Sequence, residues 1–262
     1  MHKLIWVLTA VAMMLAGTAG TSFADDQFKS IDYPTEGGIQ GRADVYESKN
    51  ASATLILLFH QAGWSRGEYR EIAPKLAKQG YRVMAVDQRS GGAVDGVRNE
   101  THYRAKRMGL GQTYLDAYAD MKAALAYARK ELAAERIVVW GSSYSASLVF
   151  RLAAEHADAV TAVMAFSPGE YFKKEEGPDY IRASAKRVKQ PVFVTSSKKE
   201  REQVKPIFDA SPAMKKILFT PASKGQHGSR ALWGKWTDND VYWAAVNGFL
   251  AGYAPAAPPH QD

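Results

Sequence analysis

Arg136-Ile-Val-Val-Trp-Gly-Ser-Ser-Tyr-Ser-Ala-Ser147 is the stretch on which the rest of the chain depends. Residues 137–140 form an unbroken apolar run rich in β-branched side chains, which predicts a buried parallel strand. A turn of small residues follows, and residues 146–155 have the apolar spacing of a helix. A serine at a sharp turn between strand and helix is held out of the sheet, beside a helix N-terminus that stabilises negative charge. The stretch therefore predicts that Ser143 lies on a nucleophile elbow.

The elbow motif departs from the usual pattern at one position. Gly141-Ser-Ser-Tyr-Ser145 follows G-x-S-x-G except that Ser145 stands in place of the second glycine. Serines also occur in such turns as helix N-caps, so the motif alone is a weak signal. Its position in an alternating pattern of strands and helices, with a histidine far downstream, favours the catalytic interpretation.

The N-terminus has the features of a secretory signal peptide. Lys3 supplies the positive charge, residues 4–15 the apolar segment, and Ser22-Phe-Ala24 a cleavage site, with cleavage after Ala19 as the alternative. We therefore expect residues 1–24 to be removed, and the mature protein to be periplasmic or secreted without an integral membrane span. Cysteine is absent, which excludes lipid attachment at the cleavage site.

The mature chain is expected to be one basic domain. Residues 25–253 are long enough for a single core, and residues 254–262, rich in Pro and Ala, predict a disordered tail. The formal net charge of the full chain is +7. Its basic clusters would suit an anionic substrate or envelope polymer, although a solvated basic face is the simpler interpretation. The basic clusters are not interleaved with aromatic residues as in nucleic-acid modules, so we expect no nucleic-acid partner.

Strands and helices alternate along the chain after an opening hairpin. Residues 28–33 and 39–46 predict that antiparallel hairpin. The long basic segment 90–111 is expected to lie over the carboxyl edge of the sheet, and 167–190 is too short for a large cap. This order predicts an α/β fold, with a mostly parallel sheet covered by helices on both faces. The later strands are expected at 54–59, 81–86, 137–140, 159–166, 191–195 and 216–219, and the main helices at 68–78, 113–132, 146–155, 202–209 and 241–250.

A serine nucleophile needs a base within hydrogen-bond reach, and the sequence contains six histidines. His227 follows the last expected strand on a loop flanked by glycines, Gly225-Gln-His-Gly228, and is the preferred base. His102, in the basic segment, is its rival. His60 at a strand end suits a turn role, and His156 suits the C-terminal end of the elbow helix. The other two lie in the expected signal peptide and tail.

The acid that orients the base should lie between Ser143 and His227 in the chain, at the carboxyl end of a strand. Glu200 lies five residues beyond the strand 191–195 and is the preferred acid. It also stands among charged residues that are typical of a solvated helix start. Glu170, which follows the preceding strand, remains the alternative.

The chain resembles the α/β-hydrolase superfamily, and within it the small dienelactone hydrolase-like serine hydrolases. The resemblance covers about residues 28–252 and rests on these stretches: Phe59-His-Gln-Ala-Gly63, Gly141-Ser-Ser-Tyr-Ser145, Ser167-Pro-Gly169, 191–200 and His227-Gly228. It implies Ser143 as nucleophile and His227 as base. It also implies Glu200 as acid, since family members carry an aspartate nine residues after a proline such as Pro191.

The same resemblance implies an oxyanion hole made by the backbone N–H groups of Tyr144 and Ala62, with Gln61 as the alternative to Ala62. His-Gln-Ala-Gly in place of the family's His-Gly-x-Gly, Ser145 in place of glycine, and a glutamate as the acid are departures. Gln61, Trp64 and Tyr171 are predicted to contact substrate.

We therefore expect an exported serine hydrolase that cleaves small-molecule carboxylic esters through an acyl-enzyme. No cofactor or metal is expected, and the oligomeric state should be a monomer or weak dimer. A peptidase or thioesterase with the same triad remains open, because the triad does not select the leaving group. The alternative from another class is a catalytically weak binding protein of the cell envelope.

Overall fold

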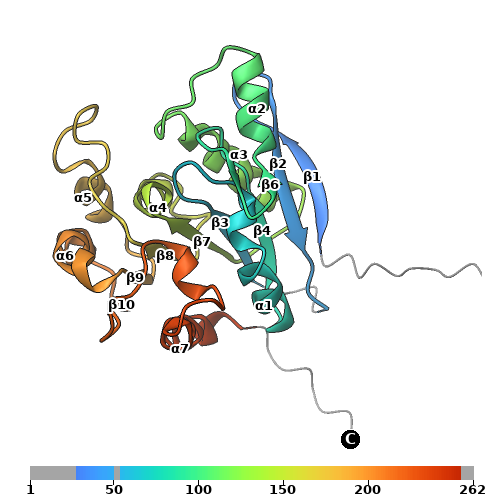
Figure 1. Cartoon of the computed structure of the whole chain (residues 1–262). Helices are drawn as coiled ribbons and strands as arrows, with labels where there is room; N and C mark the ends of the chain where they lie inside the picture. Colours follow the sequence, from blue (N-terminus) through green and yellow to red (C-terminus); the bar gives the residue numbers. More distant parts are fainter. Residues whose placement is uncertain (1–27, 50–53, 255–262) are drawn as a thin grey trace, which may run out of the picture.

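The computed structural model describes residues 28–49 and 54–254. Its centre is an eight-stranded sheet with the order β1-β2-β4-β3-β7-β8-β9-β10 (Figure 1). The predicted signal peptide and nearly all of the predicted tail lie outside the described residues. The strands of the sheet are β1 Lys29–Pro34, β2 Gln40–Tyr46, β3 Leu55–Phe59, β4 Arg82–Val86, β7 Ile137–Ser142, β8 Ala162–Phe166, β9 Val192–Thr195 and β10 Lys216–Phe219.

The sheet is mostly parallel, as the alternation of strands and helices predicts. β1 and β2 form the antiparallel hairpin, and β2 is also antiparallel to β4. Every strand pair from β4 to β10 is parallel. All six residues of β7 are buried, as expected of a central strand covered on both faces. Because parallel strands end at the same edge, the loops after β3, β7, β8, β9 and β10 converge on one side of the molecule.

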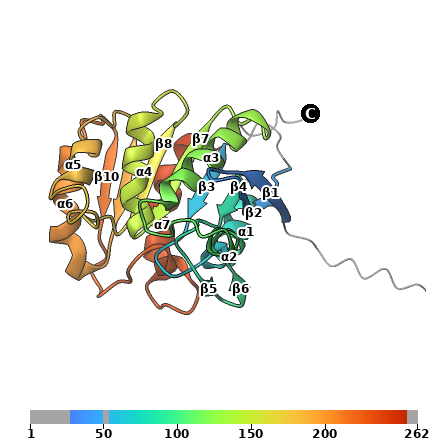
Figure 2. The ribbon, with the colours of Figure 1, turned by 90° about the horizontal axis from the view of Figure 1, so that it is seen from above.

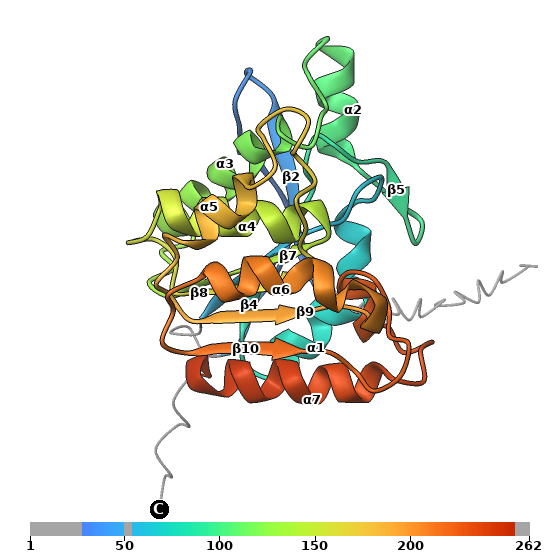
Figure 3. The same cartoon turned by 90° about the vertical axis from the view of Figure 1, so that its left-hand side faces the viewer.

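Helices cover both faces of the sheet (Figure 3). Two separate apolar cores result, one on each face, and the helices that cover the sheet each contribute their apolar side to one of them. One face is covered by α3 Ala117–Lys130, α4 Tyr144–Glu155, α5 Tyr180–Ala185 and α6 Arg201–Ala210, and the other by α1 Ile72–Lys78 and α7 Asn239–Leu250. The predicted fold class is confirmed.

One predicted helix begins later than expected. Residues 68–78 were expected to be helical throughout, but Arg66–Tyr69 is a 3-10 helix, η1, and α1 starts only at Ile72. Pro74 explains the late start, because proline has no N–H and its ring clashes with the preceding turn. It is tolerated only in the first turn of a helix.

The segment 90–111 contains more secondary structure than its polar sequence predicts. It holds a two-stranded pair, β5 Ala93–Val94 and β6 Val97–Arg98, followed by α2 Glu100–Arg107. These elements stand together at one corner of the molecule (Figure 2). The chain between β8 and β9 contains only the short α5, so no large cap is present there among the described residues.

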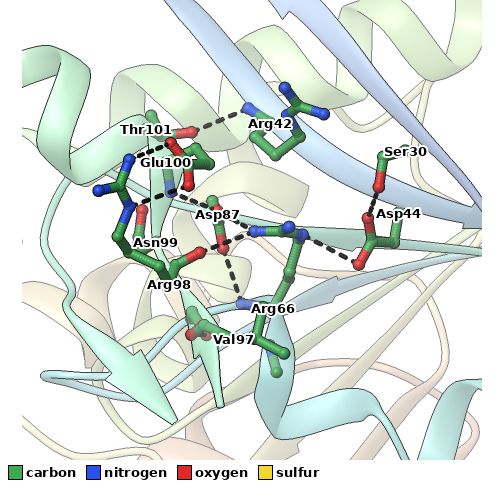
Figure 4. A network of polar contacts seen from close by, with 12 residues as sticks. Ser30, Arg42, Asp44, Arg66, Asp87, Val97, Arg98, Asn99, Glu100 and Thr101 are labelled. Carbon is green, nitrogen blue, oxygen red and sulfur yellow. Dashed lines mark hydrogen bonds and ion pairs between the residues drawn. The ribbon is translucent and has the colours of Figure 1, made fainter. Parts of the chain in front are cut away.

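A buried charge network fixes this corner to the sheet (Figure 4). The Arg66 guanidinium pairs with Asp44 on β2 at 2.9 Å and with Asp87 after β4 at 2.6 Å. Asp87 also accepts a hydrogen bond from the Glu100 N–H at the start of α2, at 2.8 Å. Asn99 caps α2 by accepting from the His102 N–H, and its amide donates to the Trp64 carbonyl. The network therefore connects α2 to the loop after β3.

Candidate active site

Ser143 occupies the sharp turn between β7 and α4. Its backbone has φ 59° and ψ −120°, a left-handed conformation that costs energy for a residue other than glycine. Gly141 allows the turn to close, since a Cβ atom there would lie 2.3 Å from the Ser145 carbonyl oxygen. This glycine therefore permits the close approach of strand and helix. Ser143 is 7% exposed, so its hydroxyl reaches the surface from a rigid base.

His227 brings its ring to this hydroxyl from the loop after β10. The Nε2 atom lies 2.8 Å from Ser143 Oγ, and Nδ1 lies 2.6 Å from Glu200 Oε1. Gly225 and Gly228 flank the loop with φ values of 67° and 72°. A side chain at position 228 would meet Ser142 Oγ at 2.5 Å, so the second glycine also allows the loop to approach the elbow.

Glu200 is held as an anion. Its Oε2 atom accepts hydrogen bonds from Ser167 Oγ at 2.9 Å and from the Ser197 N–H at 3.1 Å. Burial alone would raise the pKa of this carboxyl, but the hydrogen bond and charge of His227, together with the two serines, lower it to about 2. An ionised carboxylate at Nδ1 fixes the tautomer that leaves Nε2 free to accept the serine proton.

The oxyanion hole is best sought at two backbone N–H groups. Tyr144 is the first residue of α4, so its N–H has no acceptor within the helix. The Gln61 N–H is occupied by Glu68 Oε2 at 2.8 Å. Among the described residues no hydrogen bond occupies the Ala62 N–H, which leaves it as the donor from the loop after β3.

A model of the family described as serine aminopeptidase, S33, matches residues 50–233, well over half of the chain. The chain belongs to this family. No match was found among curated protein sequences.

Several hydrolases of the same fold are among the solved structures that are similar to this chain. An esterase of Pyrococcus furiosus has a TM-score of 0.66 and 18% identity over 88% of this chain and 95% of that one. A dienelactone hydrolase of Anabaena variabilis has a TM-score of 0.66 and 14% identity over 87% and 99%. A proline iminopeptidase of Mycobacterium smegmatis has a TM-score of 0.61 and 14% identity over 88% and 100%. The chain is thus an α/β-hydrolase that resembles dienelactone hydrolases, and an enzyme of the serine hydrolase class.

The alternative acid and the other candidate histidines form their hydrogen bonds elsewhere in the structure. Glu170 accepts the N–H groups of Ile181 and Arg182 at 2.9 and 2.8 Å, so it caps the start of α5. The Nδ1 atom of His102 is bonded to the Arg89 carbonyl at 2.8 Å. His60 is fully buried, which lowers its pKa to about 4, and the Gln88 N–H donates to its Nε2. None of the three is bonded to Ser143 or His227.

Ser145 stands in place of the second glycine of G-x-S-x-G, and its side chain forms hydrogen bonds that glycine could not. Its Oγ donates to the His60 carbonyl at 2.6 Å and accepts from Gln88 Nε2 at 2.8 Å. The link ties the first turn of α4 to the loop after β3, which carries Ala62. The substitution therefore adds a fixed contact between the two sources of the oxyanion hole.

A cavity of about 240 Å³ lies beside the nucleophile, lined by Thr113, Tyr114, Leu115, Tyr171, Phe172 and Glu175. The Tyr171 hydroxyl donates to the Ser167 carbonyl at 2.9 Å. Burial raises the pKa of Tyr171, and a hydrogen-bonding interaction with Ser143 partly offsets this rise. On the far wall, Tyr114 stacks on Tyr144 with ring centroids 4.5 Å apart. One wall residue of the cavity, Tyr171, therefore reaches Ser143.

The other two residues predicted to contact substrate lie outside this cavity. Trp64 stacks on Trp233 at 5.3 Å, and Gln61 is nearly buried with its side chain beside Gly228. In the described part of the chain, no three or more His, Asp or Glu side chains gather as a metal site, and no helix is long and apolar enough to span a membrane.

The structure gives two further polar residues a place in the site that their sequence positions do not predict. Glu68, in η1, is fully buried and accepts from Ser142 Oγ at 2.7 Å. Ser167 also has an unexpected role, since its hydroxyl joins Glu200 to the Gly228 N–H, which donates to it at 3.0 Å. Glu68 carries no motif, and the stretch Ser167-Pro-Gly169 marks the family resemblance without indicating a role for the serine hydroxyl, so only the folded chain reveals these two contacts.

Proposed function

We propose that the protein is an exported serine hydrolase that cleaves carboxylic esters through a Ser143-His227-Glu200 triad. The observation that carries the proposal is the continuous hydrogen-bonded line from Ser143 Oγ through both ring nitrogens of His227 to Glu200. Export rests on the signal-peptide pattern of residues 1–24.

The reaction follows from the positions of these atoms. Ser143 Oγ attacks the ester carbonyl while His227 Nε2 takes its proton, and the oxyanion accepts the N–H groups of Tyr144 and Ala62. The tetrahedral intermediate then collapses, the acyl–oxygen bond breaks, and His227 returns the proton to the departing alcohol. Water, deprotonated by His227, hydrolyses the acyl-enzyme. Glu200 stabilises the imidazolium in both steps.

The cavity beside Ser143 indicates the size of the substrate. Its volume of about 240 Å³ is below the roughly 300–1,000 Å³ of pockets that enclose drug-sized ligands. Its walls are largely aromatic and aliphatic. A short acyl chain or a single aromatic ring is the group that fits, so small apolar esters are the proposed substrates.

A panel of substrates tests this proposal. Purified residues 25–262 should hydrolyse p-nitrophenyl acetate, butyrate and benzoate faster than the laurate ester, and Ser143→Ala should lose this turnover by several orders of magnitude. Aminoacyl p-nitroanilides form the second arm, because the family model describes aminopeptidases. Faster cleavage of the anilides would replace the esterase by a peptidase. Absence of any turnover in folded protein would favour the binding protein.

A further inference from the structure

Glu68 places a buried carboxylate directly beneath the elbow. The residue has no exposed surface. One carboxylate oxygen accepts the Ser142 hydroxyl at 2.7 Å, and the other accepts the Gln61 N–H at 2.8 Å. The backbone N–H of Arg230 also interacts with the carboxylate. A buried carboxylate is retained only where several donors compensate its lost hydration.

The donors to Glu68 belong to three different parts of the active site. Gln61 precedes Ala62 in the loop after β3, and Ser142 precedes the nucleophile in the elbow. Arg230 follows His227 in the loop after β10. Ser142 Oγ extends the same connection, because it accepts the Ser229 N–H at 2.9 Å while it donates to Glu68. Glu68 therefore contacts a residue close to each of three catalytic positions: Ala62, Ser143 and His227.

We propose that Glu68 is a positioning residue of the hydrolase, whose carboxylate holds the oxyanion-hole loop, the nucleophile and the base in their mutual geometry. The proposal rests on the proposed function. Its physical basis is that catalysis by an oxyanion hole requires donors fixed in advance, within a few tenths of an ångström of the developing charge. Glu68 does not touch the substrate, since the Gln61 peptide and Ser142 lie between it and the reacting atoms.

The proposed role requires the ionised form of Glu68. Its hydrogen-bond partners Gln61 N–H and Ser142 Oγ both donate, so a proton on the carboxyl would remove one acceptor and add a donor. Burial raises the pKa of Glu68 to about 7, although Ser142, Gln61 and Arg230 oppose the rise. The charged and titratable groups that face it are Arg230 in η3 (Ser229–Leu232) and Tyr69 in its own element.

Glu68→Gln tests the proposal, because it keeps the volume and removes the charge. The matched control is Glu71→Gln, an exposed glutamate three positions on that accepts the Gly234 N–H. We expect Glu68→Gln to lower kcat about tenfold to hundredfold with KM nearly unchanged, a loss below that of removing an oxyanion donor outright. Glu71→Gln should leave both constants within about twofold.

The pH profile separates positioning from general stability. In the wild type, the acid limb of kcat/KM should contain two protonations, that of the base and that of Glu68, and Glu68→Gln should retain one. A merely structural residue would lower kcat without changing the slope of this limb. Should Glu68→Gln fail to fold, Ser142→Ala removes one arm of the contact and should lower kcat about threefold to tenfold.

A readout that does not need turnover distinguishes failure of this proposal from failure of the proposed function. Backbone amides of Gln61 and Ser229 should exchange with deuterium at least tenfold faster in Glu68→Gln than in Glu71→Gln. Unchanged exchange and unchanged kcat in an active enzyme would overturn the role of Glu68 alone. A wild-type protein without ester turnover would overturn the function instead, whatever the amides show.

Discussion

Two glutamates of the active site lie on either side of the elbow strand, and their surroundings shift their pKa values in opposite directions. Glu200 follows β9 and Glu68 follows β3, with β7 between them in the sheet order. Glu200 faces the imidazole of His227, and its pKa falls to about 2. Glu68 faces mainly neutral donors in a fully buried site, and its pKa rises to about 7.

The comparison shows that hydrogen bonds alone do not keep a buried carboxylate charged near neutral pH. Both residues accept bonds from backbone and serine donors, yet only the one with an ionisable partner in contact has a lowered pKa. Environments that drive the pKa values of two chemically identical groups apart are typical of active sites. The Glu200 side thus serves proton transfer, and the Glu68 side serves geometry.

The largest effect is expected on the Glu200 side. Glu200→Gln should lower kcat by roughly a hundredfold or more, because the imidazolium loses its counter-charge and His227 loses the partner that fixes its tautomer. Glu170→Gln is the control, since Glu170 only caps α5. Steady-state kinetics with p-nitrophenyl butyrate decide the ranking, and a larger loss in the control would move the acid to Glu170.

The second prediction uses the dependence of stability on pH. A carboxyl with a folded pKa near 7 binds its proton more tightly in the native state, so the free energy of unfolding falls as pH rises from about 4.5 to 7. For Glu68, whose pKa rises to about 7, the full loss is about 3 kcal/mol. Glu200 acts in reverse: its contribution is present above pH 4.5 and is lost as pH falls toward 2.

Urea unfolding between pH 2 and pH 8 measures the contributions of both glutamates to the free energy of unfolding. Relative to the wild type, Glu68→Gln should flatten the curve between pH 5 and pH 8, and Glu200→Gln should flatten it below pH 4.5. Parallel curves for the wild type and Glu68→Gln across the neutral range would show that the burial of Glu68 does not raise its pKa.

A smaller effect is expected at Ser145, which joins α4 to the loop after β3. Ser145→Ala removes the bond to the His60 carbonyl and should lower kcat about fivefold to tenfold, a loss of roughly 1 kcal/mol. Ser147→Ala is the matched control, because Ser147 is equally buried on the same helix but bonds to Gly169. Similar losses in melting temperature with unequal losses in kcat would support the role of Ser145 in the oxyanion hole.

The smallest effect is expected at the cavity wall. Tyr171→Phe removes the hydroxyl that bonds to the Ser167 carbonyl and contacts Ser143, and should lower kcat about twofold to fivefold. The preference for short acyl chains should stay, because the ring remains. A shift of preference toward long chains would show that the hydroxyl, and not the ring, limits the cavity.

Much of the fold is local in the sequence, and this part could be predicted. The elbow stretch combines strand, turn and helix signals within twelve residues, and the glycine-flanked His227 loop follows the last strand directly. The corner formed by β5, β6 and α2 was missed as secondary structure because its strands have two residues each and its stability depends on the distant Asp44, Arg66 and Asp87.

The candidate site also contains residues that the sequence predicts and residues that only the fold reveals. Ser143, His227 and Glu200 follow from spacing and chain order, and the structure brings all three together. Glu68 and the Ser167 hydroxyl act only through contacts between loops far apart in the chain, so a single sequence predicts neither contact, although Ser167-Pro-Gly169 marks the family resemblance. The preference for Ala62 over Gln61 is already implied by the family resemblance, and the bond from the Gln61 N–H to Glu68 supports it.

The most direct test of the account is active-site labelling of Ser143. A fluorophosphonate requires both a serine activated by a base and an oxyanion hole, so its reaction depends on the roles of Glu200 and Glu68 together. Intact mass and peptide mapping should show one adduct on Ser143 in the wild type, none in Ser143→Ala, and slowed labelling in Glu200→Gln and Glu68→Gln. An adduct on Ser145 or Ser142, or no adduct on folded wild-type protein, would contradict the account.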